Sequence, residues 1–69
     1  MNMIPVSSSN LVAIGYDESS STLRVEFKAG GTYDYYDVPQ GEFDGLRTAS
    51  SHGEYLARNI KGKYRYARV

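Results

Sequence analysis

The sequence predicts a small α+β protein, with three to four antiparallel strands in a β-meander that two short C-terminal helices cover on one face. Two observations carry this prediction. In the first half of the chain, apolar and polar side chains alternate, as they do on half-buried strands. In the second half, apolar residues recur every three or four positions, as on one side of a helix. The chain has 69 residues, so we expect one domain, 1–69.

The first clear strand is expected at residues 11–16, with Val12, Ile14 and Tyr16 on one face. Residues 4–6 precede it and form either a short edge strand or a lead-in that packs its apolar side chains. The segment between them is polar and small, which is typical of a turn.

Residues 23–28 alternate apolar and charged side chains, which predicts an antiparallel strand with one wet face. Gly30 and Gly31 follow, and they can supply the positive φ angles of a tight hairpin. The tyrosine-rich run 32–38 then forms the next strand, and Pro39 ends it. These strands make the expected meander.

The tyrosine-rich strand allows two interpretations. Tyr33 and Tyr35 share one face, where they could stack bases as sheet aromatics do in RNA-binding modules. They could equally be cross-strand partners of the apolar residues in 23–28, and this core role is the one we favour. Tyr36 and Tyr66 are expected to be surface aromatics.

Two helices are expected after the strands. Phe43, Leu46 and Ala49 form an apolar stripe on the first. The second is expected to run from about His52 to Ile60. The residues expected in the core are Ile14, Tyr16, Leu23, Val25, Phe27, Tyr33, Tyr35, Val38, Phe43, Leu46, Leu56 and Ile60.

Local signals set the ends of the second helix. Ser51 and Glu54 fit a capping box, and Gly62 fits a C-terminal stop. Asn59 is expected to hydrogen bond a loop backbone group and so hold this helix to the sheet or to the serines near the N-terminus. Residues 64–69 alternate again and are expected to form a last strand at the sheet edge or an extended tail.

The open face of the sheet is expected to be wet. The side chains assigned to it are those of Arg24, Glu26, Lys28, Asp34 and Tyr36.

Composition excludes several classes of protein. The chain has no cysteine and one histidine, His52, so we expect no disulfide, no metal site and no cofactor. No apolar run is long enough for a membrane span, and the N-terminus does not resemble a secretory signal, so we expect a cytoplasmic protein with no membrane partner. Ser51 beside His52 is better explained by capping than by nucleophilic catalysis, so we expect no enzyme and no small-molecule substrate.

Positive charge is concentrated at the C-terminal end of a chain whose net charge is zero. With interleaved tyrosines, this segment has the side chains that neutralise phosphates and stack on bases. It could also be a solvated edge strand protected from aggregation by its charges. The candidate nucleic-acid-binding residues are Arg58, Lys61, Lys63, Tyr64, Arg65, Tyr66 and Arg68.

Short motifs in a fixed order extend over nearly the whole chain. They are Val6-Ser7-Ser8, Ile14-Gly15-Tyr16-Asp17, Leu23-x-Val25-x-Phe27 with Gly31, Tyr33-x-Tyr35, Val38-Pro39, Ala49-x-Ser51-x-Gly53-x-Tyr55, Asn59-Ile60 and Tyr64. In this order the motifs resemble the KTSC domain family, small domains of bacteria and phages that also occur at the C-terminus of some lysyl-tRNA synthetases. The resemblance implies a small stand-alone domain, and the synthetase context suggests RNA binding.

Two functions from different classes therefore remain open. The first is a non-enzymatic module that binds RNA or tRNA through the basic C-terminal segment. The second is a small protein-interaction module, such as a phage-borne regulator that docks on a host protein, which the compact chain without an evident catalytic site also allows.

Overall fold

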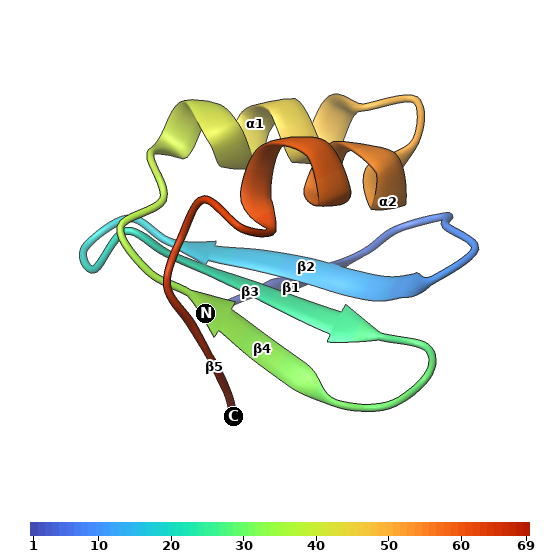
Figure 1. Ribbon diagram of the computed structural model, residues 1–69, viewed down its shortest axis with the longest axis horizontal. Coiled ribbons are helices and arrows are strands. Elements are labelled where there is room, and N and C mark those ends of the chain that lie inside the picture. Colours follow the sequence, from blue (N-terminus) through green and yellow to red (C-terminus); the bar gives the residue numbers. More distant parts are fainter.

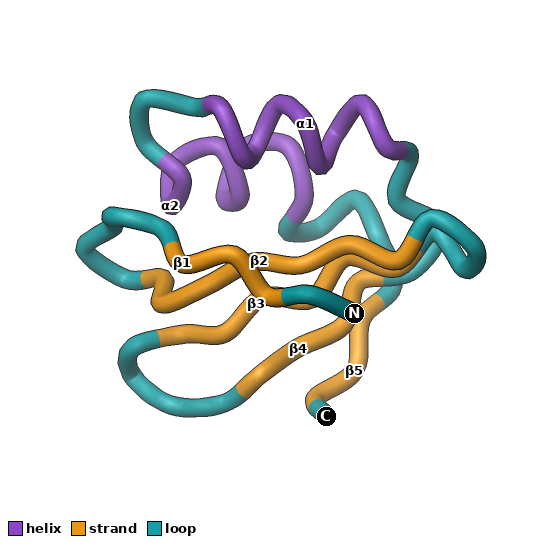
Figure 2. The backbone as a smooth tube through the Cα atoms, turned by 180° about the vertical axis from the view of Figure 1, so that it is seen from behind, coloured by secondary structure: helices purple, strands orange, loops and turns teal.

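A computed structural model describes residues 1–69 as a five-stranded antiparallel sheet covered on one face by helices (Figure 1). The strands follow one another across the sheet in chain order, which is a meander. The helices form a single layer, and the other face of the sheet carries none (Figure 2). The elements are β1 (Met3–Pro5), β2 (Leu11–Asp17), β3 (Thr22–Phe27), β4 (Thr32–Tyr35), α1 (Gln40–Thr48), α2 (His52–Tyr55), η1 (Leu56–Ile60) and β5 (Tyr66–Arg68).

The α+β prediction is confirmed, and the sheet is wider than three to four strands. β5 pairs with β4 and is the additional strand that the alternation near the C-terminus indicated. β1 pairs with β2, with Ile4 opposite Ile14, so the N-terminal segment is an edge strand.

The hairpin between β3 and β4 turns where the two glycines predicted it. Gly30 and Gly31 have φ angles of 108° and 91°, in the region that side chains with a Cβ rarely adopt. The amide of Phe27 donates to the Gly31 carbonyl across the turn, at 3.1 Å. This turn fixes the register in which Val25 lies opposite Tyr33.

The second helix begins as predicted and then widens. α2 continues directly into η1, a π-helical turn in which the Lys61 amide donates to the Leu56 carbonyl. Leu56 and Ile60 are fully buried, as expected. Gly62, with φ 82°, follows the end of the helix. None of the helices has the length and apolar character needed to cross a membrane.

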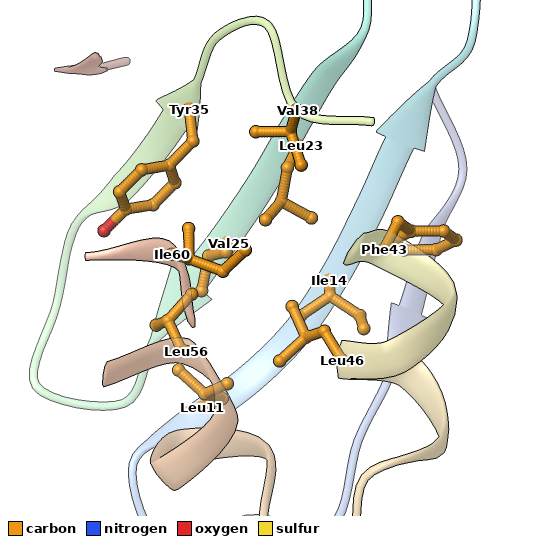
Figure 3. Packing of buried hydrophobic residues seen from close by; sticks show 10 residues of the cluster. All are labelled: Leu11, Ile14, Leu23, Val25, Tyr35, Val38, Phe43, Leu46, Leu56 and Ile60. Atoms are coloured by element: carbon orange, nitrogen blue, oxygen red, sulfur yellow. The ribbon is translucent and has the colours of Figure 1, made fainter. Parts of the chain in front are cut away.

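The core lies between the helices and the central strands (Figure 3). It agrees with the expected set except at four positions: Tyr16, Phe27 and Tyr33 are only partly buried, and Leu11 is fully buried although it was not expected there. The buried cluster is Leu11, Ile14, Leu23, Val25, Tyr35, Val38, Phe43, Leu46, Leu56 and Ile60.

A β-bulge explains the difference in β2. Leu11 lies opposite Phe27, but Ala13 lies opposite Glu26, so Val12 is an extra residue in the pairing with β3. The prediction that Val12 lies on the same face as Ile14 is therefore wrong, and the residue is 38% exposed. A period of two cannot anticipate a residue inserted into the strand.

The open face of the sheet is less exposed to solvent than predicted. Asp34 is buried there, and its carboxylate accepts two hydrogen bonds from the guanidinium of Arg24 on the neighbouring strand. At the β1 side, Met3 and the backbone of Asn2 pack over Gly15, where a side chain would collide with them. The N-terminal residues thus cover part of the face.

Two side chains of the second helix bond differently from the prediction. Asn59 donates to the Tyr55 carbonyl of its own helix, so it does not hold the helix to a loop. Ser51 caps the amide of Glu54 as expected, whereas the Glu54 carboxylate pairs with Arg58 instead of reaching back to the cap.

Candidate functional site

An open groove of about 580 Å³ lies on the helix side of the sheet, near the β4–β5 edge. The helical layer is too short to cover this edge, and β4 and β5 extend beyond it (Figures 1 and 2). The β3–β4 turn and the chain after η1 also contribute residues to its lining. The lining residues are Phe27, Ala29, Gly30, Tyr33, Tyr35, Lys61, Gly62 and Tyr66.

Aromatic rings from three adjacent strands form the floor. Register explains this: Tyr35 lies opposite Tyr66, and alternation places Tyr33 and Phe27 on the same face. The Phe27 and Tyr33 rings meet edge to face, with centroids 5.7 Å apart, and Tyr66 packs against Tyr33 at 6.0 Å and Tyr35 at 5.6 Å. Tyr66 is 61% exposed, so much of this residue is accessible to solvent.

The basic residues at the groove have no carboxylate partner. Lys61 extends over the Phe27 ring, with its Nζ 5.2 Å from the ring centroid. Arg68 follows Tyr66 by two positions and lies opposite Tyr33, beside the β3–β4 turn. The ion pairs of the chain involve other cations, those of Arg24, Arg47, Arg58 and Arg65.

Acidic side chains are held away from the groove, and none lines it. Asp34 faces the opposite side of the sheet in its pair with Arg24. Asp37 pairs with Arg65. The carboxylate of Glu42, at the start of α1, accepts hydrogen bonds from two tyrosine hydroxyls. The potential at the groove therefore comes from Lys61 and its basic neighbours.

Burial raises the pKa of Tyr35, with smaller contributions from the neighbouring Tyr66 and Tyr33 hydroxyls. The phenol therefore keeps its proton near neutral pH, where it can donate as well as accept a hydrogen bond. The groove thus combines a neutral polar group at its floor with a cation at its end.

The structure divides the residues that the sequence proposed as a nucleic-acid site. Lys61 and Tyr66 line the groove, and Arg68 lies next to it. Lys63 is exposed just after the end of the helix.

The remaining candidates are engaged elsewhere. Tyr64 packs against the core and donates to Glu42. Arg65 lies over the Tyr36 ring and pairs with Asp37, and Arg58 pairs with Glu54. These side chains are not brought together with the groove.

Of these groove residues, Tyr33 and Tyr35 were considered from the sequence as a base-stacking platform, but the core role was favoured, and Phe27 was expected only in the core. Tyr35 is indeed buried in the core cluster, and it lines the groove as well. The sequence nevertheless contains a pattern that predicts an aromatic surface here. If residues 64–69 form an edge strand beside the tyrosine strand, alternation puts Tyr66 on the face of Tyr33 and Tyr35. Two short helices cannot cover a sheet of that width, so its edge aromatics must remain accessible.

A second, polar hollow of about 240 Å³ lies beside Ser51 and the Glu54–Arg58 ion pair. Ser51 accepts the Glu54 amide, and the ring of His52 hydrogen bonds through Nδ1 to the Leu46 carbonyl at 2.8 Å. Ser51 and His52 do not hydrogen bond to each other. Each has a structural partner, and they do not form the nucleophile and base of a catalytic pair.

The fold and the groove together define a small open-sheet α+β domain with an aromatic site at one edge. Residues 7–64 match the model of the KTSC domain family, and the chain belongs to that family. The structure superimposes on the crystal structure of a KTSC domain protein from Yersinia pestis with a TM-score of 0.96 and 35% sequence identity, over 99% of this chain and 96% of that one.

Relatives of two kinds share this sequence. A protein of Tsukamurella paurometabola is 41% identical over 91% of this chain and 94% of its own length. A lysine–tRNA ligase of Trichormus variabilis is 37% identical over 78% of this chain, which corresponds to 10% of the ligase. The same sequence unit therefore occurs at nearly full length in a small protein and as a small part of a large enzyme.

Proposed function

We propose that this chain is a non-enzymatic RNA-binding module and that the aromatic groove is its RNA-binding site. The observation that carries the proposal is the meeting of an exposed stacking ring, Tyr66, with the unpaired cations of Lys61 and Arg68 on a surface without carboxylates. An apolar protein partner would need neither the cations nor the absence of acids.

The two kinds of side chain have separate tasks in this proposal. The ring of Tyr66 stacks on a base, which is worth about 1–3 kcal/mol per base in proteins that bind single strands. Lys61 and Arg68 neutralise backbone phosphates, which supplies affinity that does not depend on sequence and falls with added salt. Lys63 adds to the same field from the exposed chain after the helix.

The relatives support RNA as the ligand. Matching lysine–tRNA ligases occur in Trichormus variabilis and Nostoc punctiforme, and the names of these enzymes specify tRNA as a substrate. A domain fused to such an enzyme meets tRNA whenever the enzyme acts. An accessory RNA-binding role would explain why the unit is retained there.

An NMR titration tests the proposal. Isotope-labelled protein is titrated at low salt with a tRNA transcript and with a single-stranded RNA oligomer. We expect signals of Phe27, Tyr33, Lys61 and Tyr66 to move with both. Tyr66→Ala should weaken binding about 5- to 150-fold, the loss of one stacked base. Tyr36→Ala is the matched control, because Tyr36 lies against Arg65 away from the groove.

The salt dependence of RNA binding shows which cations contact phosphates. Replacing Lys61 or Arg68 by alanine should lower the salt slope of binding by about one each. Arg47→Ala should not, because this cation pairs with Asp44 on α1. Titrations that leave every groove signal in place would refute RNA binding. A protein partner that survives nuclease treatment and is lost in Tyr66→Ala would point to protein docking instead.

A further inference from the structure

Tyr35 combines deep burial with a hydroxyl that no protein group binds. The residue is 3% exposed, yet it lines the groove and its hydroxyl has no hydrogen-bond partner in the protein. No enclosed polar side-chain atom in the structure lacks a partner, so this oxygen is open to the groove. In Figure 3 the hydroxyl points away from the other side chains of the core.

Four partly buried tyrosines pack against the core, and the hydroxyls of all but Tyr33 are hydrogen bonded within the protein. Tyr16 donates to the Val38 carbonyl at 2.5 Å. Tyr55 and Tyr64 donate to Glu42 at 2.6 and 3.1 Å. A tyrosine buried as deeply as Tyr35 normally finds such a partner, and Tyr35 instead directs its hydroxyl into the site.

We infer that Tyr35 is the specificity-determining residue of the groove: its hydroxyl forms a hydrogen bond with the polar edge of one unpaired nucleobase of RNA, and so selects which base is bound. This inference rests on the proposed function. It adds that the ligand is an unpaired nucleotide and that the site distinguishes bases, which stacking and phosphate contacts do not do.

The position of the hydroxyl requires an unpaired base. Tyr35 lines the groove beside Tyr66, with ring centroids 5.6 Å apart, and is only 3% exposed, so a ligand must enter the groove to reach its hydroxyl. In a duplex the Watson–Crick edges are occupied by pairing, whereas a base in a loop or at an end can be stacked on an aromatic ring and read on that edge. Tyr66 supplies the ring, and Tyr35 meets the edge.

Tyr35→Phe isolates the hydroxyl, because the ring and its packing remain. The binding constants of wild type and variant are measured for a set of uridine hexamers that carry A, C, G or U at one central position, and for a blunt RNA duplex. A hydrogen bond of about 0.5–1.5 kcal/mol corresponds to about 2- to 12-fold in affinity. We expect wild type to prefer one base by at least about twofold and to bind the duplex most weakly.

In Tyr35→Phe the preferred hexamer should lose about 2- to 12-fold in affinity, while the other hexamers change little and the spread among bases narrows. Its urea unfolding midpoint should match that of wild type, which shows that the fold is intact. The inference is overturned if wild type binds all hexamers equally, if the variant keeps the same base preference, or if the duplex binds as well as the single strands.

These outcomes are distinct from failure of the proposed function. If Tyr66→Ala abolishes RNA binding while Tyr35→Phe changes nothing, the groove is an RNA site without base selection by Tyr35. If wild type binds none of the RNAs, the proposed function itself is wrong.

Discussion

Arg24 and Asp34 form a two-pronged ion pair across β3 and β4, with Nε 2.7 Å from one carboxylate oxygen and Nη2 3.0 Å from the other. The two residues lie directly opposite each other in the register. The side chain of Asp34 is 10% exposed, whereas that of Arg24 remains 37% exposed. The pair raises the pKa of Arg24, and its hydrogen bonds let the carboxylate remain buried on the open face.

Arg24→Ala should destabilise the protein by about 1–3 kcal/mol, because it leaves the buried Asp34 carboxylate without its donor. Urea unfolding measures the change. Arg47→Ala is the matched control: its pair with Asp44 is exposed and 3.9 Å long, so we expect a change below about 0.5 kcal/mol. Equal losses in the free energy of unfolding for the two variants would show that the buried Arg24–Asp34 pair stabilises the fold no more than an exposed pair does.

Two glycines in α1 should respond in opposite directions to the same change. Nothing lies within 4 Å of a Cβ placed on Gly41, so Gly41→Ala should stabilise the helix by up to about 1 kcal/mol. At Gly45 the Cβ would collide with the phenol ring of Tyr55. Gly45→Ala should therefore destabilise by about 1–3 kcal/mol. Thermal unfolding of the two variants decides the matter, and a stabilised Gly45→Ala would contradict the packing of Tyr55 against α1.

Much of this fold is predictable from the sequence because its signals are local. Alternation in 23–28, the positive φ angles that Gly30 and Gly31 provide, and the spacing of Phe43 and Leu46 each depend on a few neighbouring residues. The structure places all of these features where the pattern indicated. The terminal strands β1 and β5 were harder to predict, because a strand of three residues has too little alternation to be distinctive.

The candidate site was only partly predictable, because it depends on how the elements are placed. Lys61 and Tyr66 were identified from composition, but Arg58 and Arg65 belong to ion pairs whose partners no pattern reveals. The accessibility of Tyr35 depends on where the helical layer ends, which alternation does not encode. Spacing gave the face on which each tyrosine lies, and tertiary packing decided whether that face is covered.

The bulge in β2 allows a test of how burial departs from simple alternation. Leu11 is fully buried and Val12 is 38% exposed, which reverses the order expected from simple alternation. Leu11→Ala should cost about 2–5 kcal/mol, a large part of the stability of so small a protein. Val12→Ala should change it by less than about 0.5 kcal/mol. Urea unfolding of both variants compares them, and a larger effect at Val12 would place the bulge elsewhere.

Glu42 connects α1 to two tyrosines, and this predicts how stability changes at alkaline pH. The hydrogen bond to Glu42 is the main cause of the raised pKa of Tyr55, and for Tyr64 it adds to the larger effect of burial. Both hydroxyls therefore keep their protons in the folded state at a pH where the unfolded chain, with tyrosine values near 10.0, has begun to lose them.

Because the folded state then binds more protons than the unfolded state, the free energy of unfolding should fall as pH rises above about 10, and be insensitive to these groups below it. Urea midpoints measured from about pH 8 to pH 11 give the slope. In the double variant Tyr55→Phe, Tyr64→Phe the decline should be shallower than in wild type. Tyr36→Phe is the matched control, because this side chain packs against Arg65 and hydrogen bonds no carboxylate, and its decline should be steeper than that of the double variant. If the double variant declined as steeply as wild type, the Glu42 hydrogen bonds would not be the source of the alkaline sensitivity.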